Sequence, residues 1–161
     1  MQRLQIAALL FTVAGMMAAC SSGGEEPIVL KIFPAKHDPD PKGEVPAGWE
    51  RVQFQGSHRS HAGVFLVAAE PLLTDWNVTA MRISKEPDHS RAIHFRLNGF
   101  GQRKMAEYCA KEANLKAPLA LKIDGRWVDF SPILRPVVDR MTVYGLTIAE
   151  AQHLDQQVQN R

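Results

Sequence analysis

An Asp-Gly pair between two strand-like segments constrains the fold more than any other feature of this sequence. Residues 119–123 read Leu-Ala-Leu-Lys-Ile and residues 126–130 read Arg-Trp-Val-Asp-Phe, with Asp124 and Gly125 between them. Asp and Gly tolerate the positive φ that a two-residue hairpin turn requires, and such a turn suits the twist of antiparallel strands. The pattern therefore predicts a tight hairpin. If the two strands pair directly across the turn, four side chains of the hairpin face the core together: Leu119, Leu121, Val128 and Phe130.

The segments around this hairpin alternate between strand-like and helix-like patterns. Residues 63–69 are a continuous apolar run, and residues 91–97 alternate between apolar and polar side chains, which is typical of strands. Asn98 is a suitable N-cap for a helix that runs to about Asn114, and residues 147–150 form a capping box for a final helix. This order predicts an α+β domain, with one antiparallel sheet and two helices packed on one face.

The segment before this domain is rich in proline and glycine. Residues 37–43 read His-Asp-Pro-Asp-Pro-Lys-Gly, a composition that excludes helix and central strand. We therefore predict a flexible tether over residues 20–48 and a folded domain over residues 49–161. The apolar stretch at residues 27–33 leaves an alternative open, in which it adds an edge strand or packs on the domain.

The first residues are typical of a targeting segment. Arg3 precedes an apolar run from Ile6 to Ala19, which is shorter than the roughly 20 residues of a membrane-spanning helix. Residues 17–20, Met-Ala-Ala-Cys, resemble a bacterial lipobox, whose cysteine becomes lipid-modified after cleavage. We thus predict a lipoprotein signal peptide over residues 1–19 and fatty acylation at Cys20. The alternative is an ordinary signal peptide, with Cys20 incidental.

The residue after Cys20 and the net charge of the chain indicate which membrane would hold the anchor and which partners are not expected. Ser21 follows the cysteine where inner-membrane retention signals carry aspartate in enteric-type sorting, so a lipid anchor in the outer membrane, facing the periplasm, is favoured over one in the inner membrane. The chain has 19 basic and 17 acidic residues, a formal charge of +2, which gives no case for a nucleic-acid partner. If Cys20 is acylated, Cys109 is the one thiol left, and we expect it to be buried.

Four segments, at compatible spacing, carry a resemblance to a known family. They are Phe65–Val67 with Glu70–Thr74, Ile93–Leu97 with Gly101 and Met105, Leu119–Arg126 with Pro132, and Thr147–Leu154. From about Ala62 to Val158, the chain resembles the head subdomain of the first large periplasmic domain of SecD and SecDF, accessory subunits of bacterial protein export. The resemblance implies the fold and a location on the export side of the membrane. It does not imply the motor function of that family.

Candidate site residues point to a binding module. Trp127, Arg96 and His94 are expected to share a sheet face away from the helices, where Trp127 would anchor a protein partner. The alternative is that an N-terminal segment covers that face. His58 and His61 are weak candidates for metal ligands, because their loop lacks a third ligand in register. No catalytic residue and no cofactor is assigned, since no nucleophile motif or phosphate-binding loop is present.

The sequence therefore predicts a non-catalytic, membrane-anchored periplasmic lipoprotein that binds a protein partner. The partner would be an envelope complex or an exported polypeptide, captured by apolar surface or by edge-strand addition. Two alternatives stay open. One is a small metal-dependent hydrolase that uses His58 and His61, and the other is a structural envelope component that self-associates.

Overall fold

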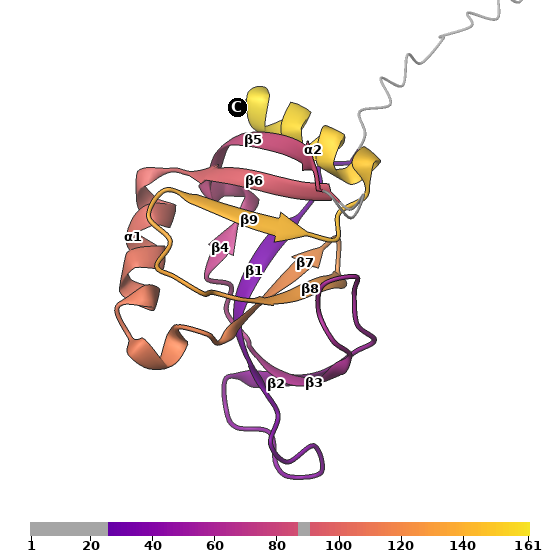
Figure 1. Cartoon of the computed structure of the whole chain (residues 1–161), viewed down its shortest axis with the longest axis vertical. Coiled ribbons are helices and arrows are strands. Elements are labelled where there is room, and N and C mark those ends of the chain that lie inside the picture. The colour runs from indigo at the N-terminus through magenta and orange to yellow at the C-terminus, as the bar shows by residue number, and fades with distance from the viewer. Residues whose placement is uncertain (1–25, 87–90) are drawn as a thin grey trace, which may run out of the picture.

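The computed structural model describes residues 26–86 and 91–161, and the predicted signal peptide and Cys20 lie outside these described residues. Antiparallel strands and two α-helices confirm the α+β class (Figure 1). The strands are β1 (Leu30–His37), β2 (Trp49–Phe54), β3 (Gly63–Ala68), β4 (Leu73–Thr74), β5 (Val78–Lys85), β6 (Arg91–Leu97), β7 (Pro118–Ile123), β8 (Arg126–Pro132) and β9 (Arg140–Tyr144). The α-helices are α1 (Gly99–Cys109) and α2 (Ile148–Gln159), and short 3-10 turns span Asp75–Asn77 and Glu112–Asn114.

The strands divide between two sheets, whereas the sequence analysis expects one. The first sheet has the order β2-β3-β1-β7-β8, with β4 also paired to β1, and the second has the order β5-β6-β9. Figure 1 shows the second sheet at one side of the domain, with α2 along β5 and α1 near the end of β6. The alternation of side chains indicates which face of a strand is buried, but it does not specify which strand edges pair. The division into two sheets was therefore not visible in the sequence.

Strand β1 corrects the predicted tether. Residues 30–37 form the central strand of the first sheet, paired with β7 through Leu30–Pro34 and with β3 through Ala35–His37. Its apolar side chains are buried, and so is Ile28 just before it. The folded domain thus begins near Ile28 and not at Trp49. The prolines and glycines that suggested a tether lie mainly in the loop after this strand, and their abundance concealed the short strand beside them.

The Asp124-Gly125 turn forms as predicted. Both residues have positive φ, 46° at Asp124 and 83° at Gly125, and Ile123 pairs with Arg126 directly across the turn. Asn98 caps α1 as predicted, because its side-chain oxygen accepts a hydrogen bond from the N–H of Gly101 at 2.8 Å. These signals were reliable because each depends on residues that are close in sequence.

A β-bulge corrects the predicted faces of this hairpin. The register shifts between Leu121 and Lys122, so that Leu121 lies opposite Asp129 and not opposite Val128. A bulge places an extra residue on one strand and reverses the facing of the residues beyond it. Phe130 consequently lies on the opposite face from Leu121, although the sequence analysis placed both on one face.

Two hydrophobic clusters result, one on each face of the first sheet. The main core lies between the two sheets and receives the buried residues of both helices, including Met105, Cys109 and Leu154. Cys109 is buried there, as expected. The second cluster lies on the other face and is mainly aromatic. It consists of Phe33, Ala35, Val52, Phe54, Phe65, Val67, Ala120 and Phe130, with Trp127 packed against it.

The capping box of α2 supplies a pH-dependent contribution to stability. The Thr147 hydroxyl accepts a hydrogen bond from the N–H of Glu150 at 3.2 Å, and the Glu150 carboxylate accepts one from the N–H of Thr147 at 2.7 Å. Arg126 also contacts this carboxylate at 2.5 Å. Partial burial raises the pKa of Glu150, but the hydrogen bonds from Thr147 and Arg126 outweigh it and lower the pKa below its usual value.

We therefore expect Glu150→Ala to lower the free energy of unfolding at pH 7 by about 0.5–1 kcal/mol, which is typical of a lost cap. Because the folded-state pKa of Glu150 is lowered, its contribution is present above the unfolded pKa and is lost as pH falls through the folded pKa. The difference between variant and parent should thus shrink near pH 3. Urea unfolding at both pH values measures it, with the exposed Glu107→Ala as control. A difference that grew on acidification would contradict this role.

Candidate binding cleft

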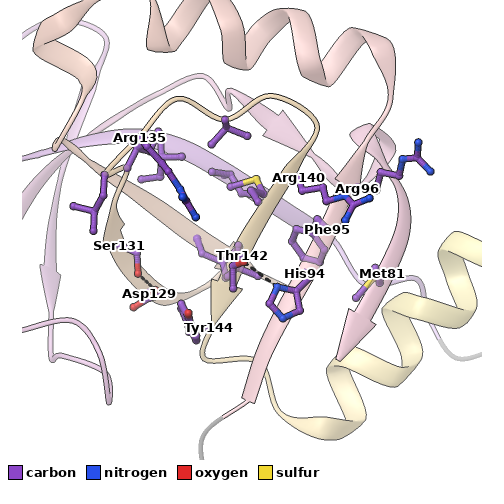
Figure 2. A pocket seen from close by; sticks show the side chains of 18 of the residues that line it. Met81, His94, Phe95, Arg96, Asp129, Ser131, Arg135, Arg140, Thr142 and Tyr144 are labelled. Atoms are coloured by element: carbon purple, nitrogen blue, oxygen red, sulfur yellow. Dashed lines mark hydrogen bonds between the residues drawn. The ribbon is translucent and has the colours of Figure 1, made fainter. Parts of the chain in front are cut away.

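A cleft of about 930 Å³ opens beside strand β9. It is lined by all three strands of the second sheet, by β8 of the first sheet, and by residues 132–137, which connect β8 toward β9. Figure 2 shows β9 running through its middle, with Arg135 and Asp129 on one side and His94 and Arg96 on the other. The cleft therefore lies where the edges of the two sheets diverge, since β8 and β9 are each the last strand of their sheet.

One end of the cleft is closed by a close approach of the two sheets. Gly145, which follows β9, has a φ of 89°, and a Cβ placed on it would lie 2.6 Å from Cγ1 of Val128 and 3.0 Å from the Val128 carbonyl oxygen. Both the backbone conformation and the space exclude a side chain at this position. Glycine thus allows the end of β9 to touch β8, while the two strands separate toward the other end (Figure 1).

The floor of the cleft is apolar and its rim is partly so. Buried side chains of the main core line it from both sheets, among them Phe95, Leu121 and Val143. Leu134 also lines the cleft, and 79% of its surface is exposed. Single exposed apolar residues are common, but one at the rim of an apolar cleft is typical of a contact surface for another molecule.

The exposed face of the second sheet carries basic side chains in two neighbouring cross-strand rows. Arg96 lies directly opposite Arg140, and in the next row His94 lies between Arg82 and Thr142. Because residues two apart on a strand share a face, these five side chains are on the same face of the sheet. This confirms that His94 and Arg96 project from the polar face, as the alternation predicts.

These arginines are poorly neutralised by the rest of the described chain. Arg140 contacts Asp139 at 3.5 Å, in a pair that is largely exposed and therefore weak. Neither Arg82 nor Arg96 has a carboxylate within 4.0 Å among residues 26–86 and 91–161. Arg135 adds a fourth guanidinium from the other side of β9. The cleft consequently combines an apolar floor with a positively charged rim.

His94 is held by hydroxyl groups on both neighbouring strands. Its Nε2 lies 2.8 Å from the Ser84 hydroxyl, and its Nδ1 lies 2.9 Å from the Thr142 hydroxyl. A hydroxyl can donate or accept, so this arrangement serves either tautomer of the ring. Both ring nitrogens are thus engaged in cross-strand hydrogen bonds, and His94 orders the sheet face beside the arginines.

Asp129, the acidic residue that lines the cleft, is buried and fully engaged. Its carboxylate accepts hydrogen bonds from the hydroxyls of Ser57 at 2.9 Å and Ser60 at 2.5 Å, and from that of Ser131. The Ser60 hydroxyl also lies 3.0 Å from the carbonyl oxygen of Phe130. These bonds satisfy a buried carboxylate and fasten the loop between β2 and β3 to β8. The serines contact a carboxylate directly, without an imidazole between them.

The structure separates Trp127 from the other two predicted partner-binding residues. His94 and Arg96 line the cleft, whereas Trp127 lies on the first sheet with the second hydrophobic cluster. Its ring meets Phe33 edge-on at 5.4 Å between centroids and lies 5.8 Å from the ring of Phe130. The division into two sheets explains this separation, because Trp127 lies opposite Lys122 as predicted, in the first sheet, whereas His94 and Arg96 belong to the second. Phe33, which belongs to the N-terminal segment named in the alternative, packs against the Trp127 ring from within the same sheet, and the ring is half-buried.

Because Trp127 is half-buried, we expect Trp127→Ala to cost about 1–2 kcal/mol of stability, below the roughly 3–5 kcal/mol of a fully buried tryptophan. Urea unfolding followed by circular dichroism measures the loss. Trp76→Ala is the matched control, since Trp76 is 71% exposed and its removal should change stability little. An unchanged stability in Trp127→Ala would show that the ring is free to serve as an anchor after all.

The weak metal candidates remain apart from the cleft. His58 and His61 are both exposed in the loop between β2 and β3. In the part of the chain that the structure describes, no three His, Cys, Asp or Glu side chains gather in a group that could hold a metal ion. Likewise, none of its described helices is long and apolar enough to cross a membrane.

Sequence reasoning missed Arg82, Arg135, Arg140 and Leu134. The pattern of β9 contained a signal, because Arg140, Thr142 and Tyr144 alternate with Met141 and Val143. That alternation does not show that β9 is the edge strand of one sheet and lies beside β8, the edge strand of the other.

Comparison with known proteins supports the fold. No family model matches this sequence, and no curated protein matches it either. Among solved structures, the fold is similar to a membrane component SecDF that enhances protein export, with a TM-score of 0.52 and 15% identity over 82% of this chain and 62% of that chain. It is also similar to SecDF in a super-membrane-facing form, with a TM-score of 0.51 and 16% identity over 81% of this chain and 18% of that chain.

The aligned part is less than two thirds of either SecDF chain, and the identity is low. The likeness therefore establishes the fold, and it confirms the predicted SecD-like resemblance. The class of protein defined by fold and site is a SecD-like α+β domain with an open, positively rimmed apolar cleft.

Proposed function

We propose that this protein is a non-catalytic binding module of the bacterial cell envelope, which captures a protein partner in its cleft. The observation that carries the proposal is the composition of that cleft. It has an apolar floor, an exposed Leu134 at its rim, and the edges of two sheets beside it. Such surfaces suit polypeptides, because apolar side chains and backbone groups can both be satisfied there.

The similarity to SecDF supports a place in protein export or envelope assembly. SecDF is described as a membrane component that enhances protein export, and the shared fold supports a comparable location on the periplasmic side. In this proposal, lipidation of Cys20 tethers the domain to the membrane, with the outer membrane favoured.

Partner capture can be tested with two variants from one loop. Leu134 lines the cleft, whereas Val138 is similarly exposed in the same segment but does not line it. We expect Leu134→Asp to remove a partner that copurifies with the wild-type protein from solubilised envelopes, and Val138→Asp to retain it. Equal recovery with both variants would overturn the role of the cleft.

Anchoring is tested separately. Cys20→Ala should move the protein from the membrane fraction to the soluble periplasmic fraction and abolish incorporation of labelled fatty acid. An unchanged partition would overturn the lipoprotein part of the proposal without affecting the binding part.

A further inference from the structure

Strand β9 presents backbone groups to the cleft. The N–H of Leu97 donates to the carbonyl oxygen of Asp139 at 2.8 Å, so these residues form a hydrogen-bonded pair of the β6–β9 ladder. In an antiparallel ladder such pairs alternate with pairs whose backbone groups point outward. The backbone N–H and C=O groups of Arg140 and Thr142 therefore point away from β6, toward the side of β9 that has no strand partner among the described residues.

A strand added at this edge would have two different faces. Side chains opposite Met141 and Val143 would turn toward the apolar floor, where Leu119 and Leu121 also lie. Side chains opposite Arg140 and Thr142 would turn to the exposed face, next to the row formed by Arg140 and Arg96. Opposite charges on neighbouring strands attract, whereas like charges repel.

We propose that β9 binds an extended peptide that alternates apolar and acidic residues, added as a further strand of the second sheet. The apolar residues pack on the floor and against Leu134, and the acidic residues pair with Arg140, Arg96 and Arg135. The charge of the rim selects carboxylates, and the exposed leucine and the strand edge select a peptide over a purely anionic polymer. This inference rests on the proposed function and specifies the chemistry of its partner.

The test uses short synthetic peptides and the described domain with its preceding residues. Fluorescence anisotropy compares a peptide that alternates valine with glutamate, one that alternates valine with lysine, and two forms of the glutamate peptide, N-methylated on the amides of one edge or of the other. We expect the glutamate peptide to bind, and to lose binding when the amides that face β9 are methylated but not when those on the other edge are. Arg96→Glu with Arg140→Glu should weaken it at least tenfold, and the matched pair Lys42→Glu with Lys111→Glu should not.

Three results would overturn the inference. Equal binding of the glutamate and lysine peptides would exclude charge selection. Binding that survives N-methylation of both sets of amides, the one facing β9 and the one facing away, would exclude strand addition, because an added strand bonds β9 through one set. Tighter, arginine-dependent binding of inorganic polyphosphate than of the peptide would assign the rim to a different class of ligand. If the peptide fails but the Leu134→Asp variant still loses its partner, the proposed function stands and only this inference falls.

Discussion

A chain that begins at Trp49 is expected not to fold, whereas one that begins at Glu26 folds. The shorter chain lacks β1, which lies in the middle of the first sheet between β3 and β7. It loses Leu30, Ile32 and Phe33 from the two cores. Burial of each such side chain is worth about 1.5–3 kcal/mol, so the loss approaches the total stability of a domain, which is about 5–15 kcal/mol.

Circular dichroism and the dispersion of amide resonances measure this directly. We expect a disordered spectrum for residues 49–161 and a cooperative thermal transition for residues 26–161. The exposed backbone edges of β3 and β7 should also make the shorter chain aggregate. A cooperatively folded 49–161 fragment would contradict the assignment of residues 30–37 to the core and restore them to a tether.

Phe130→Ala is expected to cost about 3–5 kcal/mol, as for other buried aromatic residues. Phe130 is the centre of the aromatic cluster: its ring stacks on Phe65 at 4.2 Å between centroids and lies 4.7 Å from Phe54. Its removal should therefore leave a cavity that rings from other strands cannot fill.

Equilibrium unfolding in urea measures the effect, and Phe100→Ala is the matched control. Phe100 is 54% exposed on α1, so its loss should change stability by less than about 1 kcal/mol. Because the Trp127 ring contacts Phe130, we also expect Phe130→Ala to loosen the packing of Trp127 and to weaken its near-ultraviolet circular dichroism signal. Similar losses of stability in the two variants would contradict the burial of Phe130 in the second hydrophobic cluster.

Local signals of the sequence predicted local structure well. The Asp124-Gly125 turn, the Asn98 cap and the strand alternation of residues 91–97 depend on neighbours within a few positions, and all three formed. A strand at residues 27–33 was expected only as an alternative, at a sheet edge, because Pro34 lies inside β1 and prolines follow it. Pro34 is accommodated where the pairing of β1 passes from β7 to β3. Because this change of pairing strand depends on the arrangement of the whole sheet, the residues near Pro34 do not indicate it.

The candidate site was predicted only in part, because it too depends on which distant strands pair. His94 and Arg96 were placed on the polar face of a strand, and they do line the cleft. Trp127 was assigned to the same face because one sheet was expected; its predicted pairing with Lys122 is correct, but it lies in the first sheet and they lie in the second. Arg140 entered the site through the pairing of β9 with β6, which joins residues far apart in the sequence.

The central claim is that a protein partner binds in the cleft beside β9, and photocrosslinking in intact cells tests it most directly. A photoreactive amino acid is placed at Leu134, on the rim of the cleft, and at Gln53, which is exposed on β2 at the far edge of the first sheet. We predict one discrete crosslinked polypeptide from position 134, absent from position 53 and lost in Arg96→Glu with Arg140→Glu. Crosslinks of equal yield from both positions, or none from position 134, would contradict the account.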